Sequence, residues 1–297
     1  MHFVKMQGCG NDYVLLDARS FFTKEGERGE LAKRLCDRHY GIGADGLLIL
    51  QEGRRARLEM EMYNPDGSRA EMCGNGIRCA GKYFWEQGFT KERRFLIECM
   101  ERLVTVEYLK EEGRKAWLSA DMGQAWFEAV KTPNDNSLNM MEKAGGIARD
   151  IKEPLWEMLR MHKDIGERMV QGWRIYCVSM GNPHAVVLLE KGEEWPTQTA
   201  GPLLERAEEF PEGTNVEFVR VMDRGHIMMR VWERGVGETL ACGTGACAAA
   251  AVCMQKGLTD EKITVTLLGG ELLVQRHPST GRLLLTGPSV TVFEGEI

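Results

Sequence analysis

Two short stretches of this sequence share one form: a cysteine, a glycine, one other residue and a second glycine. They are Cys73-Gly74-Asn75-Gly76 and Cys242-Gly243-Thr244-Gly245, and each leads into a run with helical spacing of apolar residues. A cysteine at the start of a helix lies beside unpaired N–H groups and the positive end of the helix dipole, which favour its thiolate. The effect is worth up to about 2 kcal/mol, so we expect it to lower the pKa of each thiol from about 8.5 toward neutrality.

The two stretches belong to a longer repeat. The turn Gly10-Asn11 is followed by a β-forming run, and so is the turn Gly181-Asn182. The first turn precedes Cys73 by 63 residues and the second precedes Cys242 by 61 residues. The chain is therefore interpreted as a duplicated unit in which each copy presents one cysteine.

Two thiols on opposite faces of one carbon suit a particular reaction. One thiolate can remove a proton from an amino-acid α-carbon while the other thiol delivers a proton to the opposite face, which inverts the stereocentre. The backbone amides of Gly74 and Asn75, and those of Gly243 and Thr244, would form an anion site for the α-carboxylate. Because a thiolate is a weak base for such a proton, we also expect the two copies to close over the substrate and exclude water.

A simpler interpretation is that these are buried cysteines in glycine-rich turns, since free cysteine is among the most buried residue types. This interpretation would account for a single motif, but it does not account well for two matching motifs in one chain. An isolated histidine such as His184 is more often structural, so His184 is proposed only as a helper group.

Other polar residues on turns or strand ends could hold the rest of a substrate. Arg234 could bind a second carboxylate through a bidentate contact, and Glu233 could pair with an ammonium group. Turn asparagines offer amide donors and acceptors, although a single turn asparagine is usually present for backbone reasons. They are Asn11, Asn64, Asn182 and Asn215.

Composition excludes several classes of protein. The 297 residues predict two domains of about 150 residues each. A net charge of −6 disfavours nucleic acid as a partner, and the N-terminal segment matches neither a signal peptide nor a membrane span. We therefore expect a cytoplasmic protein with reduced thiols. The nine cysteines contain no Cys-x-x-Cys pair, which disfavours zinc ribbons and thioredoxin-like redox sites.

Hydrophobic periodicity predicts the elements that position these residues. In the first half, strands are expected at 2–6, 12–17, 45–50, 57–63, 95–99, 104–109 and 116–119, with helices at 27–38 and 77–87. In the second half, strands are expected at 173–179, 215–221, 226–232, 263–268, 271–275, 283–285 and 290–293, with one more ending at Leu189 and helices at 202–209 and 246–255. The helices after the two motifs are apolar on most sides, which predicts that the strands enclose them.

The junction between domains is placed at Asp121-Met122-Gly123. Residues 1–120 would form the N-terminal lobe carrying Cys73, and residues 121–287 the C-terminal lobe carrying Cys242. The repeat loses register over about 133–172, which is interpreted as an insertion containing a helix after Pro154. We favour a role for this insertion in packing or in a dimer contact over a role as a lid.

Five ordered motifs together resemble the diaminopimelate epimerase family. They are Met6-Gln7-Gly8-Cys9-Gly10-Asn11-Asp12, Asn64-Pro65-Asp66-Gly67-Ser68 with the Cys73 motif, Met180-Gly181-Asn182-Pro183-His184, Gly213-Thr214-Asn215-Val216-Glu217, and Glu233-Arg234-Gly235-Val236-Gly237-Glu238-Thr239 with the Cys242 motif. The resemblance covers both halves apart from about 133–172. It implies a cofactor-independent epimerase, with no metal, that interconverts LL- and meso-diaminopimelate for lysine and peptidoglycan synthesis.

The resemblance also implies a fold and a set of roles. The fold class is α/β (α+β), with two pseudo-symmetric lobes, each a mostly antiparallel sheet or barrel around a central helix, and a C-terminal strand over 288–297 that returns to the first lobe. Cys73 and Cys242 would be the acid–base pair. Gly74, Asn75, Gly243 and Thr244 would hold the reacting carboxylate, and the four asparagines, Glu233 and Arg234 would contact chiefly the far end of the substrate. This chain has Gly46 where some relatives carry a glutamine that contacts the substrate.

Two alternatives stay open at this stage. The first is a related two-cysteine racemase acting on another amino acid, such as histidine or proline; the pair Glu233 and Arg234 favours a diamino diacid instead. The second is a redox or metal-binding protein that uses its thiols. The partner is expected to be a small amino-acid substrate, with no nucleic acid and no membrane, and a homodimer stays open.

Overall fold

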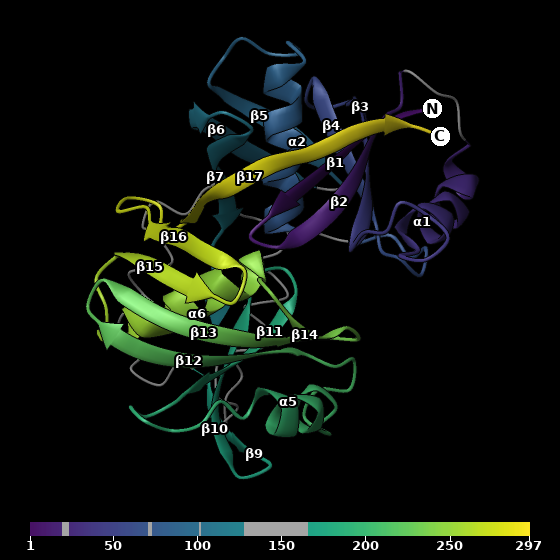
Figure 1. Cartoon of the computed structure of the whole chain (residues 1–297). Coiled ribbons are helices and arrows are strands. Elements are labelled where there is room, and N and C mark those ends of the chain that lie inside the picture. The colour runs from purple at the N-terminus through teal and green to yellow at the C-terminus, as the bar shows by residue number, and fades with distance from the viewer. Residues whose placement is uncertain (20–23, 71–72, 101, 128–165) are drawn as a thin grey trace.

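The computed structural model describes residues 1–19, 24–70, 73–100, 102–127 and 166–297, and its ribbon forms two lobes (Figure 1). The first lobe holds β1 (His2–Gly8), β2 (Asn11–Asp17), the short 3-10 turn η1 (Glu25–Glu27), α1 (Arg28–Cys36), β3 (Gly46–Glu52), β4 (Leu58–Tyr63), α2 (Gly74–Glu86), β5 (Arg94–Cys99), β6 (Arg102–Glu112) and β7 (Lys115–Gly123). The second holds β8 (Trp126–Phe127), β9 (Glu167–Val170), β10 (Trp173–Ser179), β11 (Pro183–Leu188), α5 (Thr197–Glu205), β12 (Asn215–Asp223), β13 (His226–Glu233), β14 (Gly237–Thr239), α6 (Gly243–Gln255), β15 (Lys262–Leu267) and β16 (Gly270–Arg276). The last strand, β17 (Leu283–Glu296), contacts both lobes.

The two lobes repeat one topology. Each begins with an antiparallel hairpin, β1 with β2 and β10 with β11. A helix then connects two parallel strands, β2 to β3 through α1 and β11 to β12 through α5. A second helix does the same, α2 between β4 and β5 and α6 between β13 and β15. The remaining strand pairs are antiparallel, so the predicted fold class of two pseudo-symmetric lobes with mostly antiparallel sheets is confirmed.

The two motif helices are enclosed by strands. Every residue of α2 from Gly74 to Phe84 is buried, and so is every residue of α6 from Gly243 to Met254. A helix that is apolar on all sides, such as α6, is stable only when it is covered on all sides. α2 is apolar on most sides and also carries Asn75, Arg78 and Lys82, whose buried side chains each make hydrogen bonds. Strands of one lobe surround α2 and strands of the other surround α6, as predicted.

β17 is a single strand, although two separate strands were predicted in this region. Its first part pairs with β16 over Leu283–Thr286 and its last part pairs with β1 over Val290–Glu296, while β7 lies along the other side. Gly287 and Pro288 fall between these two partners, where proline's missing N–H costs no ladder hydrogen bond on that side. The chain therefore passes from one lobe to the other without leaving the sheet.

α5 begins and ends earlier than the predicted helix at 202–209, so those bounds were wrong. Thr197, Ala200 and Leu204 form its buried stripe, and Pro202 lies inside the helix instead of at its start. Gly201 lets the helix backbone pack on the ring of Trp232, since a Cβ at Gly201 would lie 2.7 Å from Trp232 Cγ. The helix continues through Pro202, although proline has no N–H to donate within it.

The segment interpreted as an insertion falls mostly outside the described residues, and so does the helix predicted after Pro154. At the predicted junction, β7 ends at Gly123 and the next strand, β8, pairs with β10 of the second lobe. None of the helices in the described part of the chain is both long and apolar enough to span a lipid bilayer.

Candidate active site

Cys73 and Cys242 cap the two enclosed helices in the same way. Both have extended backbone angles, φ −133° and ψ 114° for Cys73 and φ −122° and ψ 117° for Cys242. The Sγ atom of Cys73 accepts a hydrogen bond of 3.3 Å from the amide of Gly76, and that of Cys242 accepts one of 3.4 Å from Gly245. The helices begin at Gly74 and Gly243, three residues before the predicted starts, so the motif glycines form their first turns.

The two helix N-termini meet at Gly74 and Gly243. A Cβ built on Gly243 would lie 3.1 Å from the Cα of Gly74, and one built on Gly74 would lie 3.3 Å from the Cα of Gly243. Leu285 of β17 packs against both, within 3.0 Å of either Cβ position. Only glycine allows this approach, and it brings the positive ends of two helix dipoles together.

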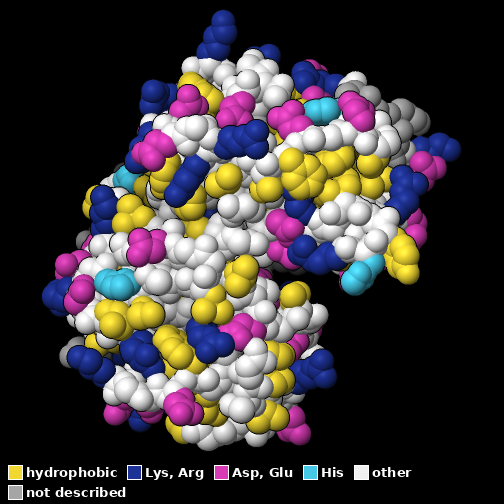
Figure 2. Space-filling model, viewed as in Figure 1, with side chains coloured by type: hydrophobic (Ala, Val, Ile, Leu, Met, Phe, Trp, Pro, Cys, Tyr) yellow, Lys and Arg dark blue, Asp and Glu magenta, His cyan; other side chains and the backbone are white. Residues whose placement is uncertain are grey.

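The meeting point opens into a cavity of about 940 Å³ between the lobes. Figure 2 shows the surface hollowed between the two lobes, on the right of the view. Every predicted catalytic and substrate-binding residue lines this cavity: Asn11, Asn64, Cys73, Gly74, Asn75, Asn182, Asn215, Glu233, Arg234, Cys242, Gly243 and Thr244. The structure thus brings together residues from both halves of the chain.

His184, the proposed helper, does not line the cavity. It is buried, with Nδ1 lying 2.7 Å from Glu217 Oε1 and Nε2 lying 3.0 Å from Asn182 Oδ1. Asn182 in turn donates to Thr244 Oγ1 at 3.3 Å. His184 therefore contacts the cavity-lining Asn182 and also Glu217, whose carboxylate acts on Cys242.

A hydrogen-bonded chain fixes the amide of Asn75. Arg78, which is fully buried, donates to Asn75 Oδ1 at 2.7 Å and to the carbonyl of Gly74 at 2.8 Å. The Nδ2 atom of Asn75 donates to Asn11 Oδ1 at 2.5 Å, and Asn11 donates to Asp45 Oδ2 at 3.1 Å. Because Arg78 can only donate, Asn75 must point its oxygen at Arg78 and its nitrogen toward Asn11.

The environments of the two thiols differ. The hydroxyl of Tyr13 lies 2.9 Å from Cys73 Sγ, whereas the nearest hydroxyl to Cys242 Sγ among its hydrogen-bond partners is that of Thr244 at 3.5 Å. Burial raises the pKa of Cys73, and the hydrogen bonds from Tyr13 and from the amide of Gly76 act in the opposite direction. Burial also places the pKa of Cys242 well above its usual value, and the carboxylates of Glu233 and Glu217 add to this effect.

The predicted fall of both thiol pKa values toward neutrality is therefore wrong. Removing a thiolate from water costs more free energy than the amides at one helix end supply by stabilising it. Burial therefore decides the direction of the pKa shift.

Glu233 and Arg234 form the wall of the cavity on the second lobe. Burial raises the pKa of Glu233, while hydrogen bonds from the hydroxyl of Thr239 and from the thiol of Cys242 oppose the rise. The backbone N–H of Arg234 donates to Asn215 Oδ1 at 3.1 Å, which holds these two strand ends together. The Arg234 guanidinium donates to the carbonyl of Glu212 and makes no ion pair with any residue that the structure describes.

Several other residues that line the cavity were not predicted as site residues from the sequence. Tyr13, Arg38, Asp45, Met62, Thr239, Leu240 and Leu268 are among them. A signal for Tyr13 was present in the repeat, since Tyr13 and His184 occupy matching places two residues after Asn11 and Asn182.

Gly46 lies beneath this part of the wall. It is buried, and a Cβ there would lie 3.2 Å from Met62 Cε and 3.5 Å from Tyr13 Cδ1. The side chains of Met62 and Tyr13 thus fill the space next to Gly46.

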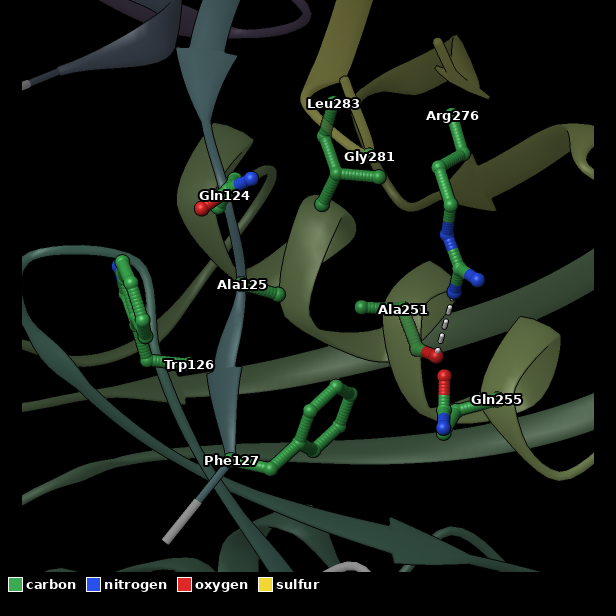
Figure 3. Close-up of a pocket in the computed structure, with 9 residues that line it drawn as sticks. All are labelled: Gln124, Ala125, Trp126, Phe127, Ala251, Gln255, Arg276, Gly281 and Leu283. Carbon is green, nitrogen blue, oxygen red and sulfur yellow. Dashed lines mark hydrogen bonds between the residues drawn. The ribbon is translucent and has the colours of Figure 1, made fainter. Parts of the chain in front are cut away.

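A second, much smaller cavity lies away from these residues. Its volume is about 40 Å³, room for a few waters, and Figure 3 shows Trp126 and Phe127 on one side and Ala251 and Gln255 of α6 on the other. Arg276 closes it by donating to the carbonyl of Ala251 at 3.4 Å. Within the described ranges, no group of three or more histidine, cysteine, aspartate or glutamate side chains is arranged to hold a metal ion.

Comparisons with known proteins identify the family of this chain. The family model described as diaminopimelate epimerase matches residues 3–128 and 176–292. The chain is 42% identical over 296 residues to the diaminopimelate epimerase of Moorella thermoacetica, covering 100% of this chain and 99% of the relative. It is 39% identical over 297 residues to that of Acetivibrio thermocellus, covering 100% and 98%.

Solved structures share the fold at low sequence identity. A PhzF-family phenazine biosynthesis protein of Bacillus anthracis superposes with a TM-score of 0.67 at 15% identity, covering 100% of this chain and 98% of the other. A probable proline racemase of Agrobacterium radiobacter superposes with a TM-score of 0.67 at 14% identity, covering 100% and 92%. The matches of the family model and of the curated relatives go further than the fold: this chain belongs to the diaminopimelate epimerase family and is an amino-acid epimerase, an isomerase.

Proposed function

We propose that this chain interconverts LL-2,6-diaminopimelate and meso-diaminopimelate by two-base proton transfer between Cys73 and Cys242. The observation that carries the proposal is the contact between Gly74 and Gly243, which brings two cysteine-capped helix N-termini to one cavity. Family membership supports the substrate. The reaction would serve lysine and peptidoglycan precursor synthesis in the cytoplasm.

The amides of the two helix ends would bind the reacting carboxylate. Gly74 and Asn75 offer N–H groups from one helix, and Gly243 and Thr244 offer them from the other. A carboxylate held there puts the α-carbon between the two thiols. As the α-proton leaves, negative charge grows on the carboxylate oxygens, where both helix dipoles stabilise it.

The proton transfer needs only residues of this chain. The thiolate of one cysteine takes the α-proton and becomes a thiol, while the other thiol gives its proton to the opposite face and becomes a thiolate. The net change is inversion at one carbon, and the next turnover can start from the other isomer. A thiol with a raised pKa is a stronger base once ionised, although less of it is ionised at neutral pH.

The far end of the substrate would bind to the second lobe. Arg234 has a guanidinium without an ion pair among the described residues, which suits a second carboxylate. Glu233 suits the distal ammonium group, and Asn64 and Asn215 border the same space. A racemase for histidine or proline would have no second carboxylate to place at Arg234.

Deuterium exchange tests the proposal. In deuterated water, the purified enzyme should introduce deuterium at the α-carbon of LL-diaminopimelate and form the meso isomer without added pyridoxal phosphate. L-proline and L-histidine serve as control substrates. Exchange into either control, together with none into diaminopimelate, would overturn the assignment.

A further inference from the structure

Tyr13 contacts one of the two thiols, and the residue at the matching place in the second copy does not contact the other. Its side chain is 1% exposed, it lines the cavity, and its hydroxyl lies 2.9 Å from Cys73 Sγ. The matching residue of the second copy is His184, which contacts Glu217 and Asn182 instead. The duplication has thus diverged at this position, and the hydroxyl beside Cys242 Sγ is instead that of Thr244, at the longer distance of 3.5 Å.

The direction of this hydrogen bond follows from the groups around it. The pKa of Tyr13 lies well above its usual value because the ring is buried and because Cys73 and Asp45 are near, so the phenol keeps its proton. A phenol that keeps its proton donates best to an acceptor that is charged. The Sγ atom of Cys73 then accepts from two donors, Tyr13 and the amide of Gly76.

The other titratable groups near Cys73 either oppose its ionisation or do not stabilise its thiolate. Glu233 faces it across the cavity and raises its pKa, and the thiols of Cys79 and Cys99 lie close enough to interact with it. Tyr13 is therefore the side-chain donor that favours the Cys73 thiolate.

We propose that Tyr13 is a positioning residue for Cys73, whose hydroxyl stabilises the thiolate and holds the sulfur at the cavity wall. The role in turnover rests on the function proposed above, while the effect on the thiol does not. Gly46 supports the assignment independently: it pairs with Tyr13 across the parallel strands β2 and β3, and its lack of a side chain leaves room for the ring.

The experiment compares Tyr13→Phe with Tyr63→Phe. Both remove one hydroxyl from a buried ring, but the Tyr63 hydroxyl donates to Glu61 at 3.0 Å and does not line the cavity. The full-length protein is alkylated with iodoacetamide between pH 7 and 11, and trypsin then releases the peptide 70–78, in which Cys73 is the single cysteine. Mass spectrometry gives the pH midpoint of Cys73 alkylation without any substrate.

Tyr13→Phe should raise the Cys73 midpoint by roughly one pH unit, a tenfold loss of thiolate at a given pH. Tyr63→Phe should leave it unchanged, and the midpoint of Cys242 should not move in either variant. An unchanged Cys73 midpoint in Tyr13→Phe, or an equal shift in Tyr63→Phe, overturns the proposal. Alkylation of all nine cysteines would reveal an unfolded variant.

A second measurement needs no substitution. Biosynthetic replacement of tyrosine by 3-fluorotyrosine makes each phenol a stronger donor, so the Cys73 midpoint should fall, and a rise or no change counts against the role of Tyr13. An enzyme that shows the Cys73 shift but no exchange into diaminopimelate would refute the proposed function and leave this inference standing. Normal epimerisation of diaminopimelate without the Cys73 shift in Tyr13→Phe would support the proposed function and refute this inference.

Discussion

The Nδ2 atom of Asn75 donates to the backbone carbonyl of Ala241 at 3.3 Å, so the asparagine of the first motif is bonded directly to the residue before Cys242. This bond joins the two halves of the site, and Arg78 fixes the amide that makes it. Asn75 thus has a structural task besides the carboxylate binding proposed for it.

Asn75→Ala should therefore lower both stability and activity. The change removes one of the two acceptors of the buried Arg78, Asn75 Oδ1, and leaves the carbonyl of Gly74, which should cost roughly 1–3 kcal/mol of unfolding free energy. Asn64→Ala is the matched control, because Asn64 lies at the cavity edge and bonds to Ser68. Urea unfolding and epimerisation rates should show both variants impaired in activity and only Asn75→Ala clearly destabilised. Equal stability of the two variants would show that the bond between the halves is unimportant.

Gly74→Ala and Gly243→Ala should each disrupt the site, since the added Cβ would lie 3.0 Å or less from Leu285 and 3.3 Å or less from the facing glycine. Gly81→Ala, on the same helix as Gly74, is the control. Its Cβ would lie 2.9 Å from Val106 and 3.0 Å from Leu118, away from the cavity. All three should lose stability by about 1–3 kcal/mol. Only the first two should lose kcat/KM by at least about 100-fold per folded molecule, which active-site titration and kinetics can measure.

Replacing either motif cysteine should abolish inversion. Cys73→Ala and Cys242→Ala each remove one of the two proposed acid–base groups, with an expected loss of roughly 100-fold to 10,000-fold in rate. Cys247→Ala tests for a general effect of thiol loss, because Cys247 is buried on α6 and does not line the cavity. Circular dichroism or chiral chromatography follows the reaction. Near-normal inversion by either motif variant would rule out the two-base scheme.

Activity should rise with pH through the neutral range. The reaction needs one thiolate, and burial holds the pKa of both thiols above its usual value, so the fraction of active enzyme grows as pH increases. A plot of log kcat/KM against pH should have a slope near one from about pH 6 to 8. A flat profile over this range would mean that the free enzyme already holds its thiolate at neutral pH.

Asp12 should contribute to stability against acid. Burial by itself would raise its pKa, but hydrogen bonds and charge from Arg38 and Lys5 lower it to about 2. A carboxylate with a lowered pKa stabilises the fold fully above the unfolded pKa of about 3.9, and the contribution is lost as pH falls toward about 2.

Asp12→Asn should therefore be less stable than the native chain at pH 7 by roughly 1–2 kcal/mol, with the difference shrinking below about pH 4. Asp66→Asn is the control, since Asp66 is exposed and bonds locally to Ser68. Urea unfolding at several pH values measures both. A difference between Asp12→Asn and the native chain that does not change between pH 7 and 2.5 would contradict the role of Asp12.

The sequence by itself predicted the repeat, the two cysteine motifs and the enclosed helices, and the resemblance of its motifs to a known family implied the fold class. The enclosed helices follow from local chemistry, because a helix that is apolar on most sides must be covered by other elements. Local patterns failed where a distant contact decided the outcome. α5 packs Gly201 on the distant Trp232, and β17 runs through Pro288 between its pairings with β16 and β1.

Only the tertiary structure decided how the thiols behave. A helix end by itself favours a thiolate, yet the depth at which both lobes enclose Cys242, and the carboxylates of Glu233 and Glu217 beside it, reverse the direction of its pKa shift. Likewise, Tyr13 reaches Cys73 from 60 residues away because α2, which Cys73 caps, packs against β2. The desolvation of a thiol and the charges that act on it depend on every group within several ångströms. Local sequence patterns do not predict which groups those are.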